Sequence, residues 1–335
     1  MRLSESSEME FLRHLRRALG GAGAGVRLGI GDDAAVLDCL PGQSLVLTCD
    51  AAVEGVHFRR DWFTESEIGQ RAVRCAVSDL AAMGARPAAV LLTLIVSPEE
   101  EATAAQAVVE GAARASEELG ARLVGGETVG SEGPLTLDVV AAGFVRAGRE
   151  LRRSGARPGD VVAVSGTLGD SAAGLAALAA GLEGQEAVAA IRRYKAPEPR
   201  LALGALLSGC EGVHAAIDIS DGLLRDAGHV AEQSGVGIEL FADALPLSPA
   251  SRAVAAALGT DPAAWALTGG EDFELLVTVA PMEHGEVAHR ARRDCAVELL
   301  GIGQVVEGHG VSLRRGDDTP VDAPSTTGWD HFRSG

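Results

Sequence analysis

Apolar residues recur along this chain in two different periods, and the change of period predicts its helices and strands. Thr64 and Glu67 form the capping-box pattern that opens an amphipathic helix expected to run to about Gly84. A second helix is predicted from Ser97 to Gly120, with a proline in its first turn. A third amphipathic segment, residues 7–20, ends at a pair of glycines.

Short apolar runs between these helices predict strands. Residues 44–49 are expected to form a strand that ends at Asp50, and residues 87–97 a fully buried strand. A short strand over 122–126 leads into Glu127, and 133–145 forms another strand. The alternation predicts an α+β fold in this half, with a sheet that carries its helices on one face.

The polar, turn-rich stretch RRSGARPGD at 152–160 predicts a domain boundary, with one domain over 1–150 and a second over 151–335. The second half opens with a strand, a turn and a helix over 161–181. It continues with predicted strands at 237–242 and 273–279 and a helix near 251–259. At 335 residues the chain is long enough for two domains with real cores.

Acidic residues stand at the junctions between these elements, next to glycines. In IDISDG, residues 217–222, Asp218 and Asp221 flank a serine where a strand stops and a helix begins. The start of a helix normally attracts anions, so a metal ion is expected to balance this charge. The same combination of carboxylate, small residue and glycine recurs in GIGDDAAV, LTCDAAVEG, VSDLAAMGA and GGETVG.

The composition restricts the partners of such a site. The formal net charge of −18 argues against nucleic acid and anionic membranes as partners. Lys195 is the only lysine, so a lysine-dependent phosphate loop is nearly excluded. Five cysteines without a C-x-x-C pair, and no apolar signal core or membrane-spanning run, predict a cytoplasmic protein.

Clustered carboxylates and scarce lysine together favour metal-assisted phosphoryl transfer. Mg²⁺ prefers oxygen ligands and usually shares a few carboxylates with substrate phosphates. The five acidic residues Asp33, Asp50, Asp79, Glu127 and Asp218 are too many for one ion but suit several ions on one polyphosphate. Phosphoryl transfer depends mostly on positioning and charge neutralisation, which metals and arginines such as Arg153 and Arg71 would supply here.

The ordered set of motifs resembles the bacterial thiamine-monophosphate kinase family over residues 8 to 332. It comprises GIGDDAAV, D-x-x-x-E-G-x-H-F, SDLAAMGA-x-P, GGET, RSGARPGD, GTLGDSAAGL, IDISDGL, GGEDFEL and GWDHF. The wider superfamily includes aminoimidazole ribonucleotide synthetase and selenophosphate synthetase. The resemblance implies ATP-dependent phosphorylation of thiamine monophosphate to thiamine diphosphate with several Mg²⁺ ions. It also implies a homodimer whose N-terminal sheets pair into a barrel, and a nucleotide bound between domains.

The resemblance also implies roles for individual residues. The metal ligands it implies are Asp33, Thr48, Cys49, Asp50, Asp79, Glu127, Asp218 and Asp221. Among them, Asp33, Asp50, Asp79 and Asp218 are the implied catalytic carboxylates. The implied nucleotide contacts are Gly126, Arg153 and Ser220, and the implied substrate contacts are His57, Glu271 and Trp329.

Three residues depart from the family pattern. Glu127 stands where the family has aspartate, Arg71 stands where a lysine is common, and Cys49 replaces a hydroxyl residue. We expect activity to persist with an altered metal preference. Two alternatives stay open: another ATP-using superfamily enzyme, such as a cyclo-ligase acting on a ribonucleotide amidine, and a non-catalytic protein that binds Mg-nucleotide.

Overall fold

The computed structural model describes residues 26–28, 36–37, 39–315, 319–321 and 328–329. The predicted helix over 7–20 and the predicted metal ligand Asp33 lie outside these residues. The chain forms two compact units, one up to Leu80 and from Ala85 to Gly148, the other Ala81–Gly84 and from Arg149 onward. Within the described residues, no helix has the length and apolarity needed to cross a membrane.

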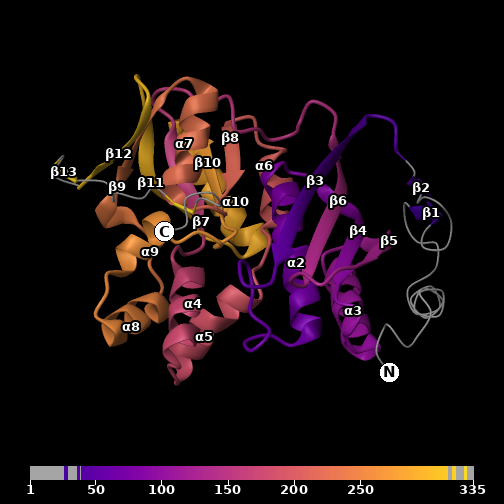
Figure 1. Ribbon diagram of the computed structural model, residues 1–335. Helices are drawn as coiled ribbons and strands as arrows, with labels where there is room; N and C mark the ends of the chain where they lie inside the picture. The colour runs from indigo at the N-terminus through magenta and orange to yellow at the C-terminus, as the bar shows by residue number, and fades with distance from the viewer. Residues whose placement is uncertain (1–25, 29–35, 38, 316–318, 322–327, 330–335) are drawn as a thin grey trace. The chain divides into compact units, whose positions relative to one another are not determined.

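The first unit is built on a four-stranded sheet in the order β3-β6-β4-β5 (Figure 1). Its strands are β3 (Gln43–Val53), β4 (Arg86–Val96), β5 (Arg122–Gly130) and β6 (Thr136–Arg146). β4 and β5 are parallel, whereas β6 runs antiparallel to both β3 and β4. A separate ribbon pairs β1 (Val26–Leu28) with β2 (Val36–Leu37).

Two helices, α2 (Glu65–Ala82) and α3 (Ala102–Glu118), cover one face of this sheet. They approach closely because both carry glycine: a Cβ on Gly69 would lie 1.9 Å from the Val108 carbonyl oxygen. The strand residues on the helix side, such as Val90, Leu137 and Ala141, are buried. The predicted one-sided arrangement of this half is therefore confirmed.

Several predicted boundaries need correction. β3 continues past Asp50 to Val53, because β6 pairs with it along its whole length. β4 is buried on one face only, and Glu127 lies inside β5 rather than after it. α3 begins at Ala102, because residues 97–100 form a turn in which the Ser97 carbonyl accepts the Glu100 N–H.

The second unit is a seven-stranded mixed sheet in the order β13-β12-β9-β11-β7-β10-β8 (Figure 1). Its strands are β7 (Val161–Ser165), β8 (Val213–Asp218), β9 (Gly237–Phe241), β10 (Leu275–Val279), β11 (Leu299–Val306), β12 (Gly310–Arg314) and β13 (Pro320–Val321). Its helices are α4 (Asp170–Ala180), α5 (Gln185–Lys195), α6 (Leu201–Leu207), α7 (Leu223–Ser234), η2 (Ala242–Ala244), α8 (Pro249–Leu258), α9 (Pro262–Thr268) and α10 (Pro281–Cys295).

Helices cover both faces of this larger sheet. Alternate residues of β7 point to opposite sides: Val162 and Val164 pack with residues of α7 and α9, and Ala163 packs with residues of α6 and α10. The interior strands β7 and β10 are therefore buried on both sides, which explains why their sequences are almost entirely apolar. Polar chemistry in this unit is consequently confined to strand ends and loops.

Candidate active site

In the first unit, the structure brings together two predicted metal ligands, Thr48 on β3 and Asp79 on α2. The Thr48 hydroxyl donates a hydrogen bond to Asp79 Oδ2. Asp79 lies in the last turns of α2, where no basic side chain offsets the negative end of the helix dipole. A half-buried carboxylate and a hydroxyl are hard oxygen donors, so this pair fits a magnesium ion.

The other predicted ligands of this unit lie on both sides of the sheet. Thr48 and Asp50 share the side of β3 that faces the helices, whereas Cys49 points to the open face and donates its S–H to Asp138, 3.1 Å away. Glu127 occupies the same row of the sheet as Asp138 and accepts the N–H of Thr128 at 2.8 Å. Register therefore groups Glu127 with Asp138 and groups Asp50 with Thr48.

Two further predicted positions in this unit are defined by backbone contacts. A Cβ at Gly126 would lie 1.9 Å from the Leu92 carbonyl oxygen, so this residue has to be glycine. His57 lies in the turn after β3, and its Nδ1 accepts the Val53 N–H at 3.1 Å. Because Nδ1 accepts this bond, the neutral ring carries its proton on Nε2.

In the second unit, IDISDG forms the junction between β8 and α7. Asp218 is the last residue of β8, is buried, and stands opposite Leu275 of β10. The loop that follows is held by Asp226, whose Oδ2 accepts the N–H groups of Ser220, Asp221 and Gly222 at 3.1, 3.0 and 3.1 Å. The predicted ligands Asp218 and Asp221 thus lie beside a third carboxylate.

The electrostatics of this junction favour a cation. Burial, followed by the nearby carboxylates of Asp218 and Asp221, raises the pKa of Asp226 to about 7. Oxygens of Asp221 and Asp226 and a ring nitrogen of His229 lie within 4.8 Å of one another. Arg225 Nε lies 3.4 Å from Asp221 Oδ2 and balances part of this charge. The carboxylate oxygens that remain suit a divalent ion such as magnesium.

The GGEDFE segment, residues 269–274, pairs with the same loop. The N–H of Glu271 donates to the Ser220 carbonyl at 2.7 Å, and the N–H of Phe273 donates to the Ile219 carbonyl at 2.9 Å. Trp329 joins them, because its N–H donates to the Asp221 carbonyl at 2.9 Å. The structure therefore gathers the predicted residues Ser220, Asp221, Glu271 and Trp329 at one place.

The backbone of this segment is strained. Glu271 and Phe273 have φ angles of +57° and +51°, in the left-handed region that such side chains rarely adopt. Strain of this kind costs about 1–3 kcal/mol per residue and persists only where the surroundings impose it. Two buried carboxylates of the same segment, Asp272 and Glu274, provide that constraint.

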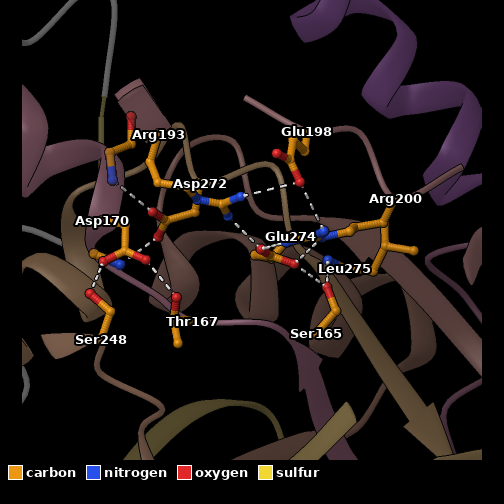
Figure 2. A network of polar contacts seen from close by, with 12 residues as sticks. Ser165, Thr167, Asp170, Arg193, Glu198, Arg200, Ser248, Asp272, Glu274 and Leu275 are labelled. Atoms are coloured by element: carbon orange, nitrogen blue, oxygen red, sulfur yellow. Dashed lines mark hydrogen bonds and ion pairs between the residues drawn. The ribbon is translucent and has the colours of Figure 1, made fainter. Parts of the chain in front are cut away.

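Figure 2 shows how Asp272 and Glu274 are anchored. Asp272 accepts the N–H groups of Gly169 and Ser171 at 2.7 and 3.1 Å, which caps the start of α4. The fully buried Glu274 binds the guanidinium groups of Arg193 and Arg200 and the hydroxyl of Ser165. Backbone N–H groups at the start of α4, together with side chains from α5, β7 and the start of α6, thus hold the segment that presents Glu271.

Arg153, a predicted nucleotide contact, lies in a turn at the start of the second unit. The hydroxyl of Ser234 accepts the N–H groups of Gly155 and Ala156, each at 3.1 Å, and donates to the Arg153 carbonyl at 3.2 Å. This single hydroxyl closes the turn and leaves the Arg153 side chain exposed. Arg71, in contrast, is buried on α2.

Comparison with known proteins identifies the family. The models for the N-terminal and C-terminal domains of AIR synthase related protein match residues 31–145 and 157–316. Thiamine-monophosphate kinase of Salmonella typhimurium is 38% identical over 316 residues, 92% of each chain. That of Mycobacterium tuberculosis is 41% identical over 264 residues, 78% of each chain. The chain belongs to the thiamine-monophosphate kinase family.

Solved structures agree with this assignment. The thiamine-monophosphate kinase of Stenotrophomonas maltophilia superposes with a TM-score of 0.80 at 36% identity, covering 96% of this chain and 99% of that one. A structure described as AaThiL complexed with AMPPCP and TMP has a TM-score of 0.76 at 34% identity and covers 99% of both chains. Escherichia coli HypE, at 24% identity and a TM-score of 0.76, shares the fold.

For this thiamine-monophosphate kinase family member, sequence reasoning missed the residues that hold the site in place. Asp226 holds the IDISDG loop from a position just after it, and Asp272 and Glu274 hold the GGEDFE segment from inside it. A usable signal was present, because each is a carboxylate in or beside one of the motifs. All three carboxylates are buried. Such residues need partners, and backbone N–H groups and arginines are the partners found here.

Proposed function

We propose that this protein transfers the γ-phosphoryl group of ATP to the phosphate of thiamine monophosphate, which yields thiamine diphosphate and ADP. Membership of the thiamine-monophosphate kinase family supports this reaction. Within this chain, the observation that supports the reaction is that backbone hydrogen bonds join the IDISDG loop to the GGEDFE segment and to Trp329. Backbone hydrogen bonds there join the motif proposed to bind metal, IDISDG, to the two segments proposed to bind the cationic substrate.

The side chains at this meeting point suit the substrate. Thiamine monophosphate carries a permanently charged thiazolium ring, which attracts carboxylates and aromatic faces. Glu271 supplies a carboxylate, and Trp329, with 44% of its surface exposed, supplies an indole. We assign both, together with His57, to substrate binding, and we assign Gly126, Arg153 and Ser220 to the nucleotide.

Magnesium would neutralise the polyphosphate and align its oxygens when bound. We assign it to Asp33, Thr48, Cys49, Asp50, Asp79, Glu127, Asp218 and Asp221, with several ions sharing these donors. In the reaction, an oxygen of the substrate phosphate forms a bond to the γ-phosphorus as the bond to the β–γ bridging oxygen breaks, and ADP leaves. The task of the protein is to hold the two phosphates in line and to exclude water.

The same proposal extends to assembly and location. The open face of the four-stranded sheet exposes Leu45, Leu47, Leu91 and Val129, and we propose that it pairs with a second copy of the chain to form a dimer. The five cysteines are free thiols, in keeping with a cytoplasmic location.

The test is an assay of the purified protein with ATP, Mg²⁺ and thiamine monophosphate. We expect equal amounts of ADP and thiamine diphosphate, and no ADP when thiamine monophosphate is left out. ADP release that depends instead on a ribonucleotide amidine would indicate a cyclo-ligase. Nucleotide binding without ADP release under all metal conditions would indicate a non-catalytic protein.

A further inference from the structure

Asp226 binds three successive peptide N–H groups with one oxygen atom. Its Oδ2 accepts from Ser220, Asp221 and Gly222, while its own N–H donates to the Gly222 carbonyl at 3.0 Å. The three amides precede α7, where no backbone carbonyl of the helix can accept them, so the Asp226 side chain takes that role. Asp226 lies in the first turn of α7 with 2% of its surface exposed, so water does not replace it.

The other ends of the same peptide groups hold the two segments assigned to the substrate. The peptide that joins Ser220 to Asp221 gives its N–H to Asp226 and accepts the Glu271 N–H at its carbonyl. The next peptide, from Asp221 to Gly222, gives its N–H to Asp226 and accepts the Trp329 N–H at its carbonyl. Because a trans peptide is planar, fixing the direction of its N–H fixes the direction of its carbonyl.

We propose that Asp226 is a positioning residue whose carboxylate orients these two peptide planes and thereby places Glu271, Trp329 and the Ser220–Asp221 loop for substrate and nucleotide. The role is built on the proposed kinase reaction. Asp226 acts from inside the fold, through hydrogen bonds, on groups that face the substrates. The rival role is direct metal ligation, since Asp226 lies within 4.8 Å of Asp221 and His229.

Two substitutions separate these roles. Asp226→Asn keeps an acceptor oxygen at the same distance along the side chain but removes the charge. Asp226→Leu has similar volume and no acceptor. Asp226→Ala serves as a second variant without an acceptor, in case the leucine variant does not fold. Circular dichroism and urea unfolding establish which variants are native.

The first measurement is hydrogen exchange of the amides of residues 220–222, which needs no catalysis. In the wild type and in Asp226→Asn we expect slow exchange, and in Asp226→Leu or Asp226→Ala exchange at least about tenfold faster. Exchange in the wild type as fast as in an exposed loop would overturn the proposal. This result stands whether or not the protein phosphorylates thiamine monophosphate.

The second measurement is steady-state kinetics. We expect kcat/KM for thiamine monophosphate to fall about 10- to 100-fold in the variants without an acceptor, mainly through KM, as is typical when a supporting hydrogen bond is lost. Asp226→Asn should retain the wild-type value within about threefold and the wild-type Mg²⁺ requirement. If Asp226→Asn loses as much as Asp226→Leu and needs more Mg²⁺, Asp226 is a ligand and the positioning role is wrong. Absence of thiamine monophosphate turnover in the wild type would refute the kinase reaction. The hydrogen-exchange result would then decide whether Asp226 orients the loop.

Discussion

Asp79 shows how the environment of one residue can indicate a cation site. Its carboxylate lies near the negative end of the α2 dipole, between the fully buried residues Ser78 and Leu80, and one hydroxyl donates to it. A neutral hydroxyl balances only part of that charge. A divalent ion would complete the balance, which is why we place Asp79 among the metal ligands.

Asp79→Asn should therefore abolish turnover while the fold is kept, because an amide oxygen binds Mg²⁺ far more weakly than a carboxylate. We expect kcat to fall by more than about 100-fold, beyond the range seen for supporting residues. The assay is thiamine diphosphate formation, with circular dichroism to check folding. Glu117→Gln, an exposed neutralisation on α3, is the control and should leave activity unchanged. A fully active Asp79→Asn enzyme would remove Asp79 from the metal site.

At the scale of elements, the GGEDFE segment is held by charges that balance inside the fold. Glu274 is 0% exposed and binds Arg193 at 2.6 Å and Arg200 at 2.7 Å. Glu198 approaches the same arginines from the solvent side, at 4.0 and 3.6 Å. A Cβ at Gly166 would lie 2.4 Å from the Glu274 carboxylate, so only glycine fits at this position of the turn after β7.

Glu274→Gln should destabilise the protein by about 3–5 kcal/mol, because it leaves two largely buried arginines without their shared carboxylate. Glu198→Gln is the matched control. Its carboxylate belongs to the same cluster but is more than half exposed, so it should cost less than about 1 kcal/mol. Urea unfolding of the three proteins measures both values. Equal losses of unfolding free energy from the two substitutions would mean that the burial of Glu274 does not increase the cost of removing its charge.

Asp272 predicts a pH dependence of stability. Burial is the main cause that raises its pKa from the usual 3.8 to about 7, against the opposing effect of two N–H donors. Between these values the folded protein holds a proton that the unfolded chain has lost, so this residue's contribution to stability falls as the pH rises from about 4 to 7.

Asp272→Asn removes that proton equilibrium. The free energy of unfolding of the wild type should therefore fall relative to that of Asp272→Asn as the pH is raised from about 4 to 7. Urea unfolding at several pH values measures the difference. Parallel pH profiles for the two proteins would show that Asp272 titrates normally.

Local patterns allowed some elements to be predicted accurately, and partners distant in sequence decided the others. The Thr64–Glu67 capping box is formed as predicted, because all of its bonds lie within four residues. The end of β3 was misplaced, because its pairing with β6 determines where it ends. The meeting of Ser220, Glu271 and Trp329 was implied only by family resemblance, since three distant segments build it through backbone hydrogen bonds.

At the scale of the whole molecule, the two sheets differ in what covers them. Among the described residues, the larger sheet has helices on both faces, whereas the smaller one has helices on one. Its open face carries Leu47 on β3 and Leu91 on β4, 63% and 38% exposed. Large exposed apolar side chains grouped on one face of a sheet are typical of an interface between subunits.

Leu47→Glu tests the proposed interface, because a two-fold dimer would place two new carboxylates there, one from each chain. Analytical ultracentrifugation should give twice the chain mass for the wild type and the mass of a single chain for Leu47→Glu at low micromolar concentration. Met282→Glu is the control, since Met282 is 94% exposed on α10, which belongs to the second unit and not to the four-stranded sheet. It should remain dimeric, because a single exposed apolar side chain does not make an interface. A monomeric wild type, or a Leu47→Glu variant that stays dimeric, would show that the open face is not where two copies meet.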